Sequence, residues 1–328
     1  MEIDSDPKNR RHALIQMLRL GGLATATAGV GYWLSGRSRR TEASEAFTFE
    51  GHKSIPNDPN LPELVVAHGE DPRLLVRKSL ESLGGIKRFI AQGDVVLIKP
   101  NIGWDRTPEQ AANTNPLAIA EMVKLCRGAG AKRVIVADVS CNEARRCYQR
   151  SGIAEAATAE GAEVILPDKR NFKRVDMKRS LGSWQVLEPF LVADKVINFP
   201  IAKNHELAGL TLGMKNWLGI VGGSRNWLHQ DIHRSVVDLA DFARPALTVI
   251  DAYRILVRNG PTGGSLSDVA VTKTLIAATD PVAADSYAAQ AFWKLDSSSL
   301  PFLKIASDRG LGNMNFAKVR TRFLSLGG

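Results

Sequence analysis

Residues 94–98 read DVVLI, residues 116–127 read PLAIAEMVKLCR and residues 134–137 read VIVA. The two short runs are almost wholly apolar, which is typical of strands in a parallel sheet that is covered on both faces. The middle run places its apolar residues on one side of a helix, and two glycines follow it closely. Two strands joined by a helix predict a right-handed β-α-β crossover, so the two strands should be parallel.

The rest of the chain from residue 61 onward repeats this alternation of short β-branched runs and helical patterns. Further expected strands are 64–67, 163–166, 195–199, 247–251 and 274–278, and further expected helices are 72–83, 236–242 and 282–293. The pattern predicts an α/β fold with a mostly parallel, twisted, Rossmann-like sheet flanked by helices. This domain would cover residues 61–328, and it could form two lobes with a boundary near residues 190–245.

Composition is that of a globular protein, with 44% hydrophobic and 23% charged residues among 328. The net charge of +9 is spread without a long basic block, so we do not expect a nucleic-acid partner. The three cysteines, Cys126, Cys141 and Cys147, form no C-x-x-C motif, so no iron–sulfur cluster is expected. Cys141 and Cys147 could pair with each other.

An export signal or anchor is predicted over residues 1–44. Arg10-Arg11 stands shortly before an apolar pair, which resembles the signal read by the twin-arginine export machinery. Residues 21–34 carry no charge, a length that suits a signal peptide and is short for a membrane span. The alternative is an amphipathic helix or a disordered tail. No clear cleavage site follows, so the segment could remain as an anchor.

Two expectations about location follow from this leader. The protein should be exported and lie in the periplasm, or be anchored to the outer face of the cytoplasmic membrane through N-terminal membrane contact. The polar residues 45–60, which include two prolines, would form a linker into the folded domain.

Polar residues follow several of the expected strands. They are Lys99, Asn101, Asp138, Asn198 and Asp251. Each of the acidic and amide residues could simply cap the next helix. Ligands of open α/β sheets collect at the carboxyl ends of the strands, however, so together these residues predict a ligand-binding cleft. A lysine directly after a buried strand needs a counter-charge, either from Asp138 or Asp251 or from a bound anion.

The stretch from Asp194 to His233 contains the densest group of candidate functional residues. It carries Lys203, His205, Lys215, Asn216, His229 and His233, with glycines between them. The lysines suit an anionic small molecule, with Lys203 and Lys215 acting beside Lys99. His229 and His233 would share a helix face if residues 227–233 are helical, and with His205 they could hold a divalent metal. Asp231 and Asp238 are further possible ligands; His205 could also be an ordinary surface histidine.

Landmarks along the whole domain resemble a family defined only as a domain of unknown function, number 362. They include Ile98-Lys99-Pro100-Asn101, Thr114-Asn115-Pro116, the run Ala193 to Pro200, Lys203-Asn204-His205, Met214-Lys215-Asn216 and the run Thr279 to Asp285. The resemblance covers nearly the whole chain after the leader, and it conveys no activity. Some members carry an appended ferredoxin-like cysteine cluster, which this chain lacks.

A shorter resemblance concerns lactate racemases, in which a histidine precedes a lysine by ten residues, as His205 precedes Lys215. It implies that Lys215 carries a nickel-pincer nucleotide, that His205 is an acid/base and that His229 or His233 ligates the metal. Where those enzymes have a second catalytic histidine, this chain has Asp138, which becomes a candidate catalytic residue. The sequence leaves open an exported enzyme, a non-catalytic binding or cofactor-carrier protein at the membrane, and a structural scaffold.

Overall fold

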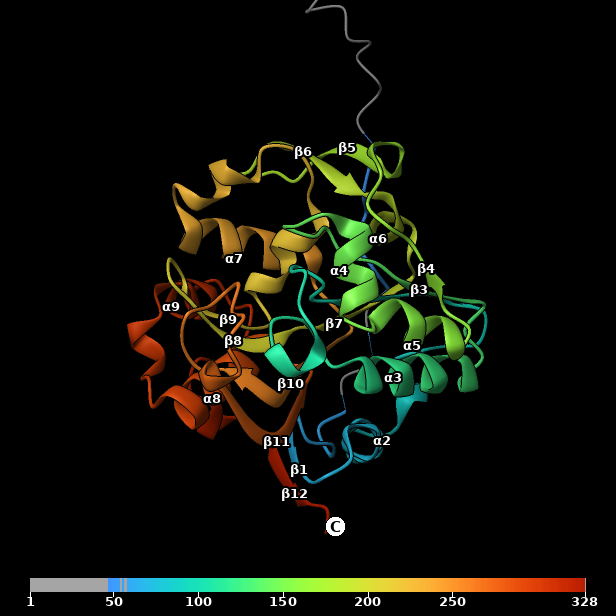
Figure 1. The fold of residues 1–328 in the computed structure, drawn as a ribbon. Helices are drawn as coiled ribbons and strands as arrows, with labels where there is room; N and C mark the ends of the chain where they lie inside the picture. Colours follow the sequence, from blue (N-terminus) through green and yellow to red (C-terminus); the bar gives the residue numbers. More distant parts are fainter. Residues whose placement is uncertain (1–46, 54, 56–57, 328) are drawn as a thin grey trace, which may run out of the picture. The chain divides into compact units, whose positions relative to one another are not determined.

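A large, mostly parallel sheet forms the centre of the computed structural model, which describes residues 47–53, 55 and 58–327 (Figure 1). The main path of the sheet, in spatial order, is β12 (Thr321–Ser325), β1 (Leu64–His68), β11 (Val269–Ala278), β10 (Leu247–Leu256), β7 (Lys195–Phe199), β2 (Val95–Pro100), β3 (Arg133–Val136) and β4 (Glu163–Val164). Only β11 runs against its neighbours along this described path. The predicted α/β class is therefore confirmed.

The predicted β-α-β unit consists of β2, α3 (Pro116–Gly128) and β3. β2 and β3 are parallel, with Val96 opposite Val134. Helix α3 begins where predicted because Asn115 caps it, accepting a hydrogen bond from the backbone N–H of Leu117 at 3.0 Å. The crossover therefore fixes the carboxyl ends of β2 and β3 at one edge of the sheet.

Helices cover both faces of the sheet, and each face has its own apolar core. α2 (Pro72–Ser82), α3 and α5 (Ile153–Ala159) lie on one side, while α7 (Ile232–Ala243), α8 (Pro281–Trp293) and α9 (Pro301–Asp308) lie on the other (Figure 1). Within β2, Leu97 belongs to one core, whereas Val96 and Ile98 belong to the other. This two-sided burial explains why the strand reads as a continuous apolar run.

Several elements depart from the sequence prediction. The additional elements are a separate hairpin, β5 (Phe172–Asp176) with β6 (Ser183–Leu187), the pair β8 (Ile201–His205) with β9 (Gly209–Thr211), the edge strand β12, and the helices α4 (Ala144–Arg150), α5, α6 (Glu188–Val192) and α9. β10 and β11 are longer than expected, and they pair with each other over most of their length. The second half of β10 and the first half of β11 contain polar residues, so the apolar runs alone underestimate the lengths of these two strands.

From Phe47 onward the chain forms one compact unit. The predicted leader over residues 1–44 lies outside the described residues, as does part of the predicted linker over residues 45–60. In the described part, no helix combines the length and apolar character needed to cross a membrane.

Candidate functional site

A cavity of about 460 Å³ opens at the carboxyl ends of β2 and β3 and beside β8. The predicted site residues that line it are Asn101, Asp138, Lys203, His205, Lys215, Asn216 and His229. Trp104, Cys141 and Arg225 also line it and were not predicted as site residues. The cleft expected from the strand ends is therefore present in the structure, and it includes much of the 194–233 stretch.

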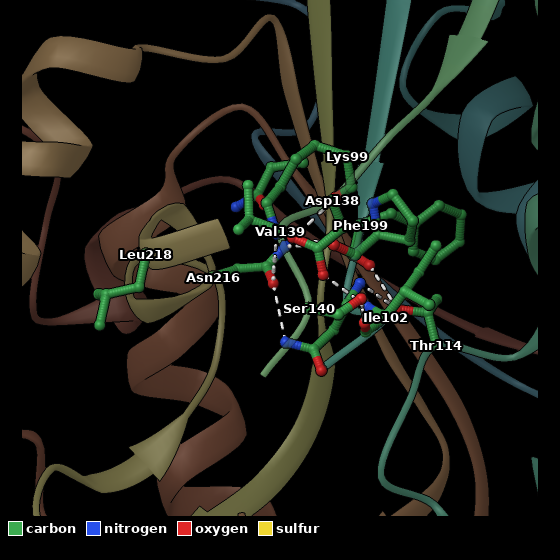
Figure 2. A network of polar contacts seen from close by, with 12 residues as sticks. Lys99, Ile102, Thr114, Asp138, Val139, Ser140, Phe199, Asn216 and Leu218 are labelled. Atoms are coloured by element: carbon green, nitrogen blue, oxygen red, sulfur yellow. Dashed lines mark hydrogen bonds and ion pairs between the residues drawn. The ribbon is translucent and has the colours of Figure 1, made fainter. Parts of the chain in front are cut away.

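Lys99 lies behind the cavity wall in a buried polar network (Figure 2). Its ammonium Nζ is 2.6 Å from Asp138 Oδ1, and it donates to Pro100 O at 2.8 Å and to Asn216 Oδ1 at 3.0 Å. The second carboxylate oxygen of Asp138 accepts from the backbone N–H of Ile102 at 2.6 Å. Burial lowers the pKa of Lys99, and Asp138 opposes that effect. Lys99 is thus a compensated buried charge.

Asn216 connects this network to the neighbouring strand. Its amide nitrogen donates to Asn198 Oδ1 at 2.8 Å, and its oxygen also accepts from Asn101 Nδ2 at 3.1 Å. Asn198 in turn donates to Gly213 O at 2.8 Å. Lys99, Asn198 and Asn216 therefore hold the 3-10 helix Lys215–Ile220 against the sheet edge, and their direct role is positioning.

A glycine is required where that 3-10 helix crosses the ion pair. A Cβ at Gly219 would lie 1.9 Å from Asp138 Oδ1 and 2.5 Å from Lys99 Nζ. The backbone carbonyl of Gly219 also accepts from Val139 N at 2.8 Å. The close approach brings Lys215, four residues earlier, to the cavity wall.

Three cations on the cavity wall lack a carboxylate partner within the described residues: Lys203, Lys215 and Arg225. Lys203 donates to Asn101 Oδ1 at 3.0 Å and to Ala112 O at 2.7 Å, both of which are uncharged. Burial lowers its pKa to about 7. Arg225 donates to the carbonyls of Val139 at 2.9 Å and Ser140 at 2.7 Å. These groups give the cavity an excess of positive charge.

Lys215 is the most isolated of the three. Its side chain is buried, with 8% of the residue exposed, and its ammonium has no hydrogen bond or ion pair among the described residues. Burial lowers its pKa to about 8, and the nearby charges of Arg225 and Lys99 act in the same direction. A buried lysine without a counter-charge is costly, so this position is unexpected for a purely structural residue.

His205 ends β8 with its ring fixed by the following turn. Its Nδ1 accepts from the backbone N–H groups of Leu207 at 3.2 Å and Ala208 at 3.3 Å. The proton of the neutral ring must then reside on Nε2. Burial, with Lys215 and Lys203 nearby, lowers the pKa of His205 to about 3. This pKa differs from the near-neutral value expected of an acid/base, and at neutral pH His205 is a hydrogen-bond donor.

The structure does not assemble the predicted histidine metal site. His229 lies in the 3-10 helix Arg225–His229, whereas His233 lies in the first turn of α7. Asp231 separates them because it caps α7 with non-helical dihedral angles, so residues 227–233 do not form the single helix that a shared face requires. His233 stacks on Phe302 and does not line the cavity. In the described ranges, no three His, Cys, Asp or Glu side chains are grouped to hold a metal.

Several acidic candidates have structural partners instead. Asp251 accepts from Asn115 N at 2.7 Å and Tyr253 N at 3.0 Å, does not line the cavity, and has a pKa raised by burial to about 6. Asp238 pairs with Arg309 and Ser180. Asp251 therefore joins the middle of β10 to the start of α3. The structure does not bring Asp251 to the cavity with the other strand-end residues, because its carboxylate binds backbone groups distant in sequence.

The cysteines are all free in the structure, so Cys141 and Cys147 do not pair. Cys141 is exposed and lines the cavity, whereas Cys126 and Cys147 are buried. Arg225 follows Gly222-Gly223 inside the 194–233 stretch. The position of Arg225 in that stretch was the only sequence signal that could have identified it as a site residue.

Fold and site together describe an α/β protein with a cationic cleft at the carboxyl edge of its sheet. A family model matches residues 96–290, and the chain belongs to that family, the Domain of unknown function (DUF362). The matched segment includes every lysine, histidine and arginine that lines the cavity.

A curated relative is a thylakoid-associated protein of Synechocystis sp. It is 27% identical over 244 residues, which cover 72% of this chain and 74% of the relative. Among solved structures, the lactate racemase apoprotein of Thermoanaerobacterium thermosaccharolyticum has a TM-score of 0.38 at 14% identity, and a Thermotoga maritima protein has 0.37 at 12%. These matches cover 71% and 74% of this chain, and the chain spans 59% and 60% of the two solved proteins.

Proposed function

We propose that this protein binds an anionic small molecule in the cavity at the carboxyl edge of its sheet. The observation that carries the proposal is the buried ammonium of Lys215, which lines the cavity and lacks a counter-charge among the described residues. Burial of an unpaired cation is unfavourable, and a bound anion would remove that penalty. The proposal assigns direct contact to Lys203, Lys215 and Arg225, and support to Lys99, Asn198 and Asn216.

The charges around the cavity support this assignment. Asp138 is the only buried carboxylate on the described cavity wall, and Lys99 already neutralises it. Glu206 also lines the cavity, but it is exposed to solvent. Three further cations therefore face one exposed carboxylate, which favours a ligand with two or more negative charges.

Ligand-dependent stabilisation tests the proposal. Dicarboxylates, phosphate esters and sulfate would be added to the purified protein at low salt while its thermal unfolding is followed. A ligand at 100 times its dissociation constant stabilises a folded protein by about 2.7 kcal/mol. We expect saturable stabilisation by at least one multivalent anion, its loss in Lys203→Met and Lys215→Met, and its retention in Lys304→Met, an exposed lysine on α9. Equal stabilisation of all four proteins would contradict the proposal.

The proposal covers both an enzyme and a non-catalytic carrier. Lys215 and His205 separate these two functions, because a carrier needs them for binding alone. If substitution of Lys215 and substitution of His205 each abolish anion binding, and the native protein turns over no bound anion, a carrier would be favoured. A divalent metal would need ligands beyond His205 and His229, so no step of the proposed function uses one.

We also propose that the protein is exported through a twin-arginine signal and works at a membrane. Arg10-Arg11 and the uncharged segment after it support this proposal, as does the thylakoid association of the Synechocystis relative. Cell fractionation of native protein and an Arg10→Lys, Arg11→Lys double variant tests it. Retention of the variant in the cytoplasm, with the native protein exported, is expected; identical distribution would contradict it.

A further inference from the structure

Lys215 differs chemically from the other lysine on the cavity wall. Lys203 donates to two uncharged oxygens, so the protein accepts two of its three ammonium protons. Lys215 has no such acceptor among the described residues, although it too is buried, with 8% of the residue exposed against 1% for Lys203. Burial lowers the pKa of Lys215 and outweighs Cys141, the nearby charge that favours the ammonium, and Lys215 lines the cavity.

The surroundings of Lys215 favour the neutral amine. Removal from water penalises the ammonium, and the positive charges of Arg225 and Lys99 penalise it further. A pKa of about 8 leaves an appreciable fraction of the amine unprotonated near neutral pH. Burial beside other cations is a recognised way to activate a lysine as a nucleophile.

His205 supplies a complementary group on the same wall. Because its Nδ1 accepts from the turn at Leu207 and Ala208, its Nε2 carries the proton. The neutral imidazole can donate that N–H to an uncharged oxygen, such as the oxygen of a carbonyl group. A fixed donor of this kind polarises a carbonyl towards attack.

We propose that Lys215 is a nucleophile that forms an imine with an anionic carbonyl compound of the 2-oxo dicarboxylate class. This inference rests on the proposed anion site. Lys203 and Arg225 would bind the two carboxylates, and Arg225 has five N–H donors for the three carbonyl oxygens it contacts. His205 Nε2–H would donate to the carbonyl oxygen and polarise the carbonyl group.

The reaction is balanced without an oxidant or reductant. The lone pair of the Lys215 nitrogen forms a bond to the carbonyl carbon, and the carbon–oxygen double bond becomes single. The carbon–oxygen bond of the resulting carbinolamine then breaks. The oxygen leaves as water with the two protons of the original amine, and a carbon–nitrogen double bond remains.

Reductive trapping tests this step. The purified protein is incubated with 2-oxoglutarate and sodium cyanoborohydride, which reduces an imine to a stable secondary amine, and the adduct is located by peptide mass spectrometry. 2-Hydroxyglutarate is the matched ligand, because it carries both carboxylates but no ketone. Lys215→Arg keeps the positive charge and cannot form the imine, and Lys304→Arg is the control on the exposed α9.

We expect one adduct per chain, at Lys215, in the native and Lys304→Arg proteins and none in Lys215→Arg. Excess 2-hydroxyglutarate should reduce trapping at least tenfold. Stabilisation by both acids without an adduct would overturn the imine and leave the anion site intact. Adducts confined to exposed lysines would also overturn the imine. If neither acid stabilises the protein and no adduct forms, both the imine and the dicarboxylate site fail.

Discussion

Lys99 lies near the end of β2 and Lys215 begins the 3-10 helix Lys215–Ile220, and the surroundings of the two lysines differ. Lys99 is fully buried and has a carboxylate, an amide oxygen and a carbonyl oxygen as partners. Lys215 is nearly as buried and has none of these in the described structure. The comparison separates a lysine that stabilises the architecture from a lysine kept available for a ligand. Their burial alone does not distinguish the structural lysine, Lys99, from the lysine available to a ligand, Lys215.

The largest loss of stability should come from breaking the buried ion pair between Lys99 and Asp138. In Asp138→Asn the ammonium of Lys99 keeps its burial but loses its charge partner. Loss of one member of a buried ion pair costs about 3–5 kcal/mol. Urea unfolding should show that loss of stability. The matched control is Glu163→Gln, which breaks the exposed ion pair with Arg133 and should cost below about 1 kcal/mol. Equal costs for the two variants would contradict the account.

A smaller effect is expected where the 3-10 helix crosses the ion pair. Gly219→Ala would place a methyl group within 1.9 Å of Asp138 Oδ1, so the helix or the pair must shift. Overpacking of this kind costs about 1–3 kcal/mol. Gly128→Ala is the control, because nothing lies within 4 Å of its added Cβ and it ends α3. Chemical denaturation measures both; a tolerated Gly219→Ala, with anion binding unchanged, would show that the contact is not a constraint.

The pH dependence of stability provides the most subtle test of Lys215. Its folded pKa of about 8 lies below its ordinary value of 10.5, so the unfolded chain binds more protons between these pH values. Its contribution to stability therefore rises with pH across that window. The free energy of unfolding of Lys215→Met, relative to the native protein, should decline from pH 8 to pH 10. A difference that stays constant with pH would show that the folded pKa is normal.

The sequence predicted the sheet and its ligand edge because both follow from local patterns. Apolar runs and a capped helix defined the β2-α3-β3 crossover, and the crossover placed Lys99 and Asp138 at one edge. The sequence could not predict which of these residues face a ligand. That depends on partners far along the chain, such as Asn216, which is 117 residues from Lys99.

The failed predictions have similarly specific causes. His229 and His233 have helical spacing, but the cap at Asp231 interrupts the helix between them. Asp251 resembled a ligand at a strand end, and it binds the backbone of Asn115, 136 residues away. Arg225 was overlooked because an arginine in a glycine-containing loop has no periodic signal. Its carbonyl partners are assembled only by the fold.

The central claim is that Lys215 is kept available for a ligand, in contrast to Lys99. The most direct test is to measure the free energy of unfolding of Lys215→Met and Lys99→Met, at pH 7 and without added anions. We predict that Lys99→Met loses about 3–5 kcal/mol, because Asp138 is left buried without its partner. Lys215→Met should be as stable as the native protein or more stable. An equal loss of stability in both variants would contradict the account.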